Sequence, residues 1–286
     1  MAETLILAGC GKMGSALLGG WLERGIDAAD VIVVESFNDT ATAVAERFGV
    51  CVVAEPGDIP PDTIPQTIVF AVKPQSMDDT VPAYARFVGT STVFLSIAAG
   101  KTIDYFQGNL GDPAAIVRAM PNTPAAVGRG ITVACANANT DDAQVRRCDE
   151  LLGAVGAVSW VDDEGLMDAV TAVSGSGPAY VFLLAECMAE AGINAGLPAE
   201  LAHQLARETV AGAGELLHRS GETAAELRTN VTSPGGTTAE ALRVLMAEDA
   251  WQPLMTKAIA AATAERTAAR CCEVRMLLAR PEAPAP

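Results

Sequence analysis

In the first part of the chain, short apolar runs alternate with segments whose apolar residues recur at helical spacing. The runs have the length of buried strands, and the segments between them are long enough for helices. The predicted strands are Thr4–Ala8, Val31–Glu35, Cys51–Val53, Thr67–Val72, Thr92–Ser96, Ile116–Met120, Ile131–Ala134 and Ala157–Val161. Helices are predicted after Gly14, over Ala41–Phe48 and over Asp141–Leu152. This alternation is typical of an α/β domain with a doubly wound, mostly parallel sheet, here residues 1–161.

From residue 162 onward the pattern changes, and no convincing strand follows as far as Cys272. Helical spacing recurs over Tyr180–Asn194, Pro198–Arg219, Thr223–Arg228, Thr238–Ala247 and Pro253–Arg280. Residues 162–280 are therefore predicted to form an all-helical domain, and the proline-rich residues 281–286 a disordered tail. The helical domain is either a self-contained bundle or the interface of a homo-oligomer.

Charge and composition disfavour several classes of partner. The 286 residues carry a formal net charge of −16, which disfavours binding to nucleic acid and to anionic membranes. The seven cysteines form no C-x-x-C pair and the two histidines lie far apart, so no metal site is predicted. Neither a secretory signal nor a convincing membrane span is apparent, and we expect a cytoplasmic protein.

A glycine fingerprint lies between the first predicted strand and the first predicted helix. Gly9, Gly11 and Gly14 have the G-x-G-x-x-G spacing of dinucleotide-binding folds. The first glycine permits a tight turn, the second lets the backbone approach a pyrophosphate, and the third lets the helix pack closely on the strand. A glycine turn without a ligand is the alternative, but the strand–loop–helix context favours a nicotinamide dinucleotide site.

Glu35 ends the second predicted strand, where an acidic residue normally binds the ribose 2′-hydroxyl of NAD. Its charge disfavours the 2′-phosphate of NADP, and no arginine follows in the next four residues. These features favour NADH. In the alternative, Glu35 points into solvent and Ser36 with Asn38 binds a 2′-phosphate.

Two further segments follow predicted strands at the edge where such sheets bind ligands. They are Ala71-Val72-Lys73-Pro74 and Ala98-Ala99-Gly100. Their small residues let a ligand approach the backbone. Lys73 is either a ligand-binding side chain or an ordinary surface lysine.

Two glycine-rich stretches interrupt the helical part, Ser174–Pro178 and Asn230–Glu240. In the second, Thr237 and Glu240 have the spacing of a capping box, which predicts that a helix begins there. Hydroxyl groups and the first N–H groups of that helix would form a site for a carboxylate. In the alternative interpretation, Asn230–Glu240 is an ordinary helix start without a ligand. The glycines of Ser174–Pro178 then only allow backbones to pack closely.

In combination, these motifs resemble the pyrroline-5-carboxylate reductase family. They include the Gly9–Gly14 fingerprint, Ala71–Pro74, Met120–Pro124, Ser174–Tyr180 and Val231–Thr238, in this order over nearly the whole chain. The resemblance implies a Rossmann-type domain followed by a helical dimerisation domain, with dimers that assemble further, commonly into decamers. It also implies reduction of the imine Δ1-pyrroline-5-carboxylate to L-proline by NADPH or NADH.

By position, the resemblance assigns these cofactor-binding residues: Ala8, Gly9, Cys10, Gly11, Lys12, Met13, Ser36, Ala71, Val72, Lys73, Pro74, Ala98, Ala99, Gly100 and Asn230. Gly14 joins them as the third glycine of the fingerprint. Glu35 joins them from its position after the second strand. The implied substrate-binding residues are Glu164, Asn230, Ser233, Gly236, Thr237 and Thr238. We expect the Thr238 hydroxyl to bind the ring nitrogen of the substrate as the catalytic residue. The rivals are a β-hydroxy-acid reductase and a non-catalytic dinucleotide sensor.

Overall fold

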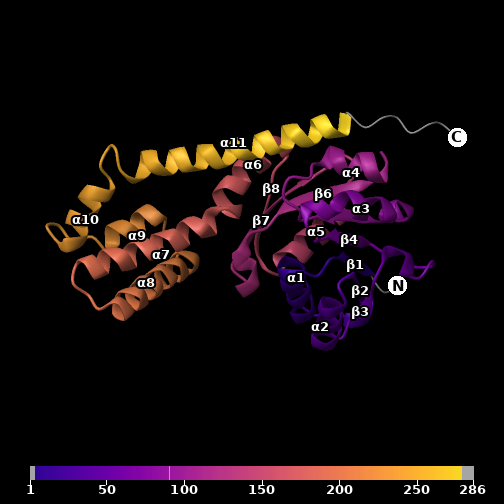
Figure 1. The fold of residues 1–286 in the computed structure, drawn as a ribbon, viewed down its shortest axis with the longest axis horizontal. Coiled ribbons are helices and arrows are strands. Elements are labelled where there is room, and N and C mark those ends of the chain that lie inside the picture. Colours follow the sequence, from indigo (N-terminus) through magenta and orange to yellow (C-terminus); the bar gives the residue numbers. More distant parts are fainter. Residues whose placement is uncertain (1–3, 90, 279–286) are drawn as a thin grey trace. The chain divides into compact units, whose positions relative to one another are not determined.

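The computed structural model describes residues 4–89 and 91–278, with side chains as far as Glu265 (Figure 1). The predicted tail 281–286 and the end of the last predicted helix lie outside the described residues. The chain forms two compact units. The first unit runs as far as Gly175 and resumes at Thr263, and the second is Ser176–Ala262.

The first unit is built on one eight-stranded sheet. Its strands are β1 Leu5–Ala8, β2 Val31–Val34, β3 Cys51–Val53, β4 Thr67–Phe70, β5 Val93–Ser96, β6 Ala115–Met120, β7 Gly130–Ala136 and β8 Gly156–Trp160. Their order is β3-β2-β1-β4-β5-β6-β7-β8. All neighbours pair in parallel except β6 and β7, which are antiparallel. The predicted doubly wound sheet is therefore confirmed.

Helices cover both faces of this sheet. Those of the first unit are α1 Lys12–Glu23, α2 Asn38–Phe48, α3 Met77–Thr80, α4 Ile103–Leu110, α5 Asp142–Gly153 and α6 Met167–Val170. Side chains of α1, α2 and α5 pack into one hydrophobic core, and those of α3 and α4 into another. Successive residues of β1 alternate between them, because neighbouring strand side chains point to opposite faces. The central strands β1 and β2 are therefore continuous apolar runs.

The strand order switches direction at β1, which is where folds of this kind bind ligands. From β1 the strand order runs outward through β2 and β3 on one side and through β4 and β5 on the other. In open parallel sheets ligands bind beyond the carboxyl ends of the strands at such a point. The loops that follow β1, β2, β4 and β5 meet there.

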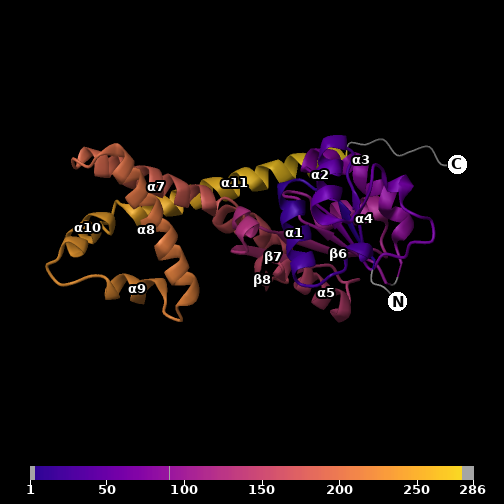
Figure 2. The same cartoon turned by 90° about the horizontal axis from the view of Figure 1, so that it is seen from below.

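The second unit is helical, as predicted. Its helices are α7 Gly177–Asn194, α8 Ala199–Arg219, α9 Ala224–Asn230, α10 Thr237–Leu245 and the first part of α11 Trp251–Leu278. Helices α7 and α8 pack side by side (Figure 1 and Figure 2). Among the described residues of this unit, the only buried apolar side chains are Ala189, Ala202 and Ala206. The interpretation as a self-contained bundle is wrong, because so small a core leaves large apolar side chains such as Phe182 and Leu254 exposed.

Local structure departs from the sequence patterns around residues 171–178. We expected the glycines of Ser174–Pro178 to keep this stretch out of helices. Instead Thr171–Gly175 forms a π-helical turn and α7 starts at Gly177, with Pro178 in its first turn. Proline fits the start of a helix, where its missing N–H has no intrahelical partner to lose. The helical run Glu164–Asn194 is long and apolar enough to cross a membrane by length and composition alone.

Candidate dinucleotide and substrate sites

The loop after β1 adopts a turn that needs glycine at two positions. Gly9 has φ +86°, and its N–H donates to the carbonyl oxygen of Val34 at 2.8 Å. A Cβ on Gly9 would lie 2.6 Å from Val72 Cγ1, and a Cβ on Gly14 would lie 2.6 Å from the carbonyl oxygen of Gly9. Both distances are shorter than the closest contact that a Cβ makes with another carbon or with an oxygen, so a side chain at either position would clash. The first and third glycines therefore do what the fingerprint predicts.

The middle glycine has a different environment. A Cβ built on Gly11 would meet no atom within 4 Å. Gly11 is the N-cap of α1, no side chain caps this helix, and its first turn contains no acidic residue. The first N–H groups of a helix have no intrahelical partners and carry partial positive charge, so the open space beside Gly11 suits a pyrophosphate. These residues fit a dinucleotide.

Glu35 lies at the end of β2 and braces this loop. Its side chain is buried, with 8 % of the residue's surface exposed. One carboxylate oxygen accepts the N–H of Cys10 at 2.9 Å and the other accepts the N–H of Phe37 at 3.1 Å. The alternative in which Glu35 points into solvent is therefore wrong, because these two N–H groups hold the carboxylate against the glycine loop.

The residues after Glu35 form an exposed rim at the carboxyl end of β2. Ser36, Phe37 and Asn38 are exposed. Cys10 is buried beneath this rim, and burial raises the pKa of its thiol, with a smaller contribution from the negative charge of Glu35. A hydrogen bond with Ser15 opposes the rise. The thiol is therefore protonated at neutral pH and acts as a small packing group.

The other two predicted cofactor-binding segments lie where expected, after β4 and β5. The N–H of Ala71 donates to the carbonyl oxygen of Ala8 at 2.8 Å, so the β4 loop and the glycine loop lie side by side. Lys73 is exposed. Ala98 is buried, and Gly100 adopts φ +93°, which a residue with a side chain rarely does.

A polar cluster that the sequence patterns did not indicate joins the β4 and β5 loops. One carboxylate oxygen of Asp78, in α3, accepts from Lys101 Nζ at 3.2 Å and from the Tyr105 hydroxyl at 2.8 Å. The Lys101 ammonium also lies 4.3 Å from the centre of the Tyr105 ring. Lys101 directly follows Gly100, so this cluster holds the β5 loop in place. Asp78 is 23 residues from Lys101, and no local sequence signal pairs them.

Glu164 also has a partner that was not predicted. Its carboxylate accepts from Arg118 at 2.7 Å and from the N–H of Ile103 at 3.0 Å. Arg118 lies in the buried strand β6, with 3 % of its side chain exposed. The sequence did contain a signal for this ion pair. Arg118 is a charged residue inside the apolar run Ile116–Met120, and a buried arginine requires a partner of opposite charge. Glu164 is therefore held by the first unit rather than projecting freely.

The predicted carboxylate site lies in the second unit, at the start of α10. Gly235 has φ +69°, and the N–H of Gly236 donates to the carbonyl oxygen of Ser233 at 3.0 Å. This turn makes Gly236 the N-cap, without a side-chain cap. The predicted capping box is wrong, because Thr237 is already the first residue of the helix and Glu240 pairs with Arg243.

The start of α10 therefore resembles the start of α1. It leaves the N–H groups of Thr237 and Thr238 without intrahelical partners, in a helix with no capping side chain. Ser233 is exposed beside them. Asn230, at the end of α9, donates to Glu222 at 2.7 Å. The structure brings the predicted substrate-binding residues of this loop together, while Glu164 belongs to the first unit.

Family models match both parts of the chain. Residues 164–269 match the description "Pyrroline-5-carboxylate reductase dimerisation", and residues 4–100 match "NADP oxidoreductase coenzyme F420-dependent". The boundary near residue 164 follows β8. The second match spans β1 to β5 and contains the glycine loop.

Relatives that align with most of the chain are also pyrroline-5-carboxylate reductases. The chain is 38 % identical over 255 residues to a pyrroline-5-carboxylate reductase of Pseudomonas aeruginosa, covering 89 % of this chain and 92 % of the relative. It is 39 % identical to that of Mycobacterium tuberculosis over 86 % of this chain and 89 % of the relative.

Solved structures show the same resemblance. A pyrroline-5-carboxylate reductase of Coxiella burnetii aligns with a TM-score of 0.88 at 31 % identity, over 94 % of this chain and 99 % of the other. The enzyme of Plasmodium falciparum with NADP bound aligns with a TM-score of 0.76 at 28 % identity, over 94 % and 98 %.

Proposed function

The chain belongs to the pyrroline-5-carboxylate reductase family, and from that premise we propose which of its residues carry out each part of the reaction. It is an NAD(P)H-dependent oxidoreductase that reduces the C=N bond of Δ1-pyrroline-5-carboxylate to give L-proline, the last step of proline biosynthesis. The observation that carries this conclusion is the similarity to these reductases along nearly the whole chain. The remaining assignments concern individual residues.

The dinucleotide binds at the crevice beyond β1, β2, β4 and β5. The N–H groups at the start of α1, next to Gly11, hold its pyrophosphate, and Ala71–Pro74 and Ala98–Gly100 line the nicotinamide side. When bound, the reduced nicotinamide supplies the hydride that the imine carbon accepts. The Asp78–Lys101–Tyr105 cluster keeps the β5 loop in position.

Glu35 sets the choice between the two dinucleotides. Its carboxylate accepts one hydrogen bond at each oxygen and retains lone pairs for a ribose 2′-hydroxyl. A 2′-phosphate at the same place would meet a negative charge in a chain that already carries −16. We therefore expect a preference for NADH, although Ser36 and Asn38 at the exposed rim offer donors for a phosphate.

The substrate carboxylate binds at the start of α10. The N–H groups of Thr237 and Thr238, with the Ser233 hydroxyl, provide its donors, and Gly236 lets the backbone approach. Asn230 lies at the other side of the loop, and Glu164 contributes from the first unit or from a second subunit. In an acidic chain, such local donors must offset the long-range repulsion of an anion.

The reduced ring nitrogen must end up protonated, and a protonated imine is the better hydride acceptor. The Thr238 hydroxyl binds this nitrogen. A threonine hydroxyl is a weak acid, so its role is to orient a protonated substrate or to relay a proton from water. In both cases its loss slows the chemical step.

The helical unit forms a homodimer. The match of residues 164–269 to a dimerisation domain and the exposed apolar side chains of α7, α8, α10 and α11 support this assignment. Covering those side chains with a second copy removes from water an apolar surface that the unit cannot bury itself. A dimer interface also accounts for the apolar run Glu164–Asn194 without a membrane. We propose a cytoplasmic enzyme without nucleic-acid partners, whose dimers assemble further, with a decamer as one arrangement.

The test is loss of the near-ultraviolet absorbance of reduced cofactor on addition of Δ1-pyrroline-5-carboxylate, run in parallel with NADH and NADPH. Substrate-dependent oxidation with kcat/KM higher for NADH supports both the reaction and the role of Glu35. Oxidation with NADPH strongly preferred keeps the reaction and removes the proposed role of Glu35. Absence of oxidation in protein shown to bind a dinucleotide contradicts the proposed reaction.

A further inference from the structure

The motif Met120–Pro124 has no part in the assignments above. It follows β6, which pairs in parallel with β5 and places Arg118 opposite Ser96. The motif therefore begins at the carboxyl edge of the sheet, next to the loop Ala98–Gly100 that we assign to the nicotinamide side. Because neighbouring strands lie about 5 Å apart, the loops after β5 and β6 are within reach of one ligand.

Asn122 joins this loop to two other segments of the first unit. It is buried, with 9 % of the residue's surface exposed. Its side-chain oxygen accepts the N–H of Ile131, in β7, at 3.0 Å. Its amide nitrogen donates to the carbonyl oxygen of Ser174, in the π-helical turn, at 3.2 Å. A Cβ on Gly175 would lie 2.8 Å from the Cε atom of Met120, so the loop and the turn are closely packed.

The bond to Ser174 replaces one that the helix itself cannot make. In an α-helix the carbonyl of residue 174 accepts the N–H of residue 178, and Pro178 has no N–H. The N–H of the following residue, Ala179, donates to Ser176 at 3.0 Å instead. The Asn122 amide supplies the missing donor. π-helical turns displace the regular ladder of hydrogen bonds and are frequent at functional sites. The shape of this turn therefore depends on a side chain from the loop after β6.

The proposed path of the dinucleotide leads toward this loop. Its adenosine ribose is assigned to Glu35 after β2, and its pyrophosphate to the N–H groups beside Gly11 after β1. Along the strand order β2-β1-β4-β5-β6, the nicotinamide half then extends over β4 and β5 toward the end of β6. The half-buried Met120 is the last residue of β6. Its loop is therefore the next segment that the nicotinamide ring would meet.

We propose that Asn122 is a positioning residue for hydride transfer. By bonding to Ile131 and Ser174, it fixes Met120 and the π-helical turn as the wall of the nicotinamide site on the β6 side. The wall holds the ring in the position from which its hydride reaches the imine carbon. A misplacement of about 1 Å can slow such a transfer about 10²-fold. The inference rests on the proposed function, because it requires the nicotinamide to lie beyond β4 and β5.

The test compares kcat and dinucleotide binding in the full-length protein and in Asn122→Ala. We expect kcat to fall about tenfold, because the remaining packing limits how far the wall can move. By isothermal titration calorimetry, the Kd of the reduced dinucleotide should rise about fivefold, the scale of one hydrogen bond. ADP-ribose, or its 2′-phosphate if the wild type prefers NADPH, lacks the nicotinamide ring. Its Kd should therefore change by less than about twofold.

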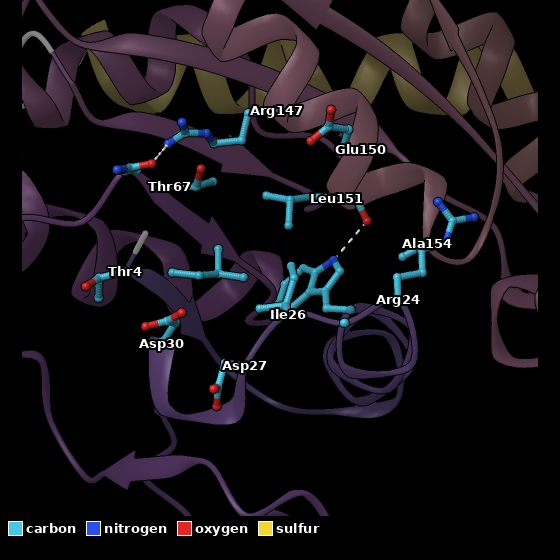
Figure 3. A pocket seen from close by; sticks show the side chains of 14 residues that line it. Thr4, Arg24, Ile26, Asp27, Asp30, Thr67, Arg147, Glu150, Leu151 and Ala154 are labelled. Carbon is cyan, nitrogen blue, oxygen red and sulfur yellow. Dashed lines mark hydrogen bonds between the residues drawn. The ribbon is translucent and has the colours of Figure 1, made fainter. Parts of the chain in front are cut away.

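A matched bridge at the opposite edge of the sheet provides the control. Asn137 accepts the N–H of Ile116 at 3.0 Å and donates to the carbonyl oxygen of Ala114 at 2.9 Å, at the amino end of β6. Figure 3 shows this opposite edge at β1 and β4, where a cavity of about 530 Å³ is lined by none of the residues assigned to the dinucleotide or the substrate. Asn137→Ala should lower the melting temperature as Asn122→Ala does, and leave kcat and both Kd values within about twofold of wild type.

Two more variants test the bond to Ser174 itself. Asn122→Asp keeps the shape and the acceptor for Ile131 but turns an acceptor toward the Ser174 carbonyl, so kcat should fall at least about tenfold. Pro178→Ala restores a backbone N–H to the helix. In that background Asn122→Ala should lower kcat only about twofold to threefold, because the Ser174 carbonyl then has a second donor. If Pro178→Ala does not fold, Asn122→Asp decides this point.

Three results would overturn the proposal. The first is wild-type kcat in Asn122→Asp. The second is the same kcat in Asn122→Ala as in Asn137→Ala, which would make the role of Asn122 structural only. The third is equal weakening of the reduced dinucleotide and of ADP-ribose. Failure of the proposed reaction is a separate outcome, because the wild type would then bind the dinucleotide without oxidising it. The calorimetric comparison needs no substrate and still decides whether Asn122 acts on the nicotinamide side.

Discussion

Replacing Glu164 by glutamine tests whether the buried ion pair holds the start of the helical part against the sheet. Glutamine keeps the shape and can still accept the N–H of Ile103, so the substitution removes mainly the negative charge beside Arg118. Arg118 would then be a buried cation without a counter-charge, since its side chain is 3 % exposed. Removing one partner of a fully buried ion pair lowers the free energy of unfolding by about 3–5 kcal/mol.

Water reduces this cost on the glutamate side, where 25 % of the side chain is exposed. We therefore expect Glu164→Gln to lower the free energy of unfolding by about 2–3 kcal/mol. The assay is urea denaturation followed by circular dichroism. Because unfolding of a dimer depends on subunit concentration, all variants are compared at one concentration.

A matched exposed pair provides the control. In the ion pair of Glu240 with Arg243, 69 % and 72 % of the side chains are exposed. Glu240→Gln should therefore change the free energy of unfolding by less than about 0.5 kcal/mol. A cost for Glu164→Gln no larger than that of the control would refute the reasoning, because burial would then add nothing to the pair.

Three further predictions concern the two binding loops and the thiols. Gly14→Ala should lower the free energy of unfolding by about 1–3 kcal/mol, because its Cβ would lie 2.6 Å from a carbonyl oxygen. Gly11→Ala should instead keep the melting temperature and weaken dinucleotide binding. Calorimetry with NADH would measure that binding. Thr238→Ala should lower kcat/KM roughly 10²-fold, the scale of losing one catalytic hydrogen-bond donor, and near wild-type turnover would remove this hydroxyl from the mechanism. Burial raises the pKa of Cys148 to about 12, so its thiol is protonated at pH 8 and should resist a thiol reagent that labels the exposed Cys51. Mass spectrometry of the labelled peptides would check this, and labelling of both residues at equal rates would contradict it.

The glycine loop could be predicted because its determinants are local. A buried strand, three glycines at fixed spacing and an apolar helix lie within Leu5–Glu23, and each constrains the next. Glu35 could be found from its distance along the chain, but not its two bonds to the loop backbone. Those bonds depend on how β1 and β2 pair.

Contacts between distant segments could not be predicted in the same way. Arg118 and Glu164 are 46 residues apart, and Asp78 and Tyr105 are 27 apart. The spacing of such residues along the sequence does not predict that they are in contact, because the contact depends on the order of the strands in the sheet. The capping box failed for a local reason, because the turn before α10 shifts the helix start by one residue.

The two hydrogen bonds of the Glu35 carboxylate have a consequence for changing the cofactor of this enzyme. Rational redesign toward a 2′-phosphate would usually replace the acid at this position with serine or arginine. Here that single exchange would also release the backbone at Cys10 and at Phe37, which loosens the glycine turn proposed to bind the pyrophosphate of either dinucleotide. In the proposed assignment, cofactor choice and loop rigidity thus depend on the same side chain. A successful switch, in the laboratory or in evolution, requires a compensating mutation that re-anchors the loop before or together with the loss of the acid.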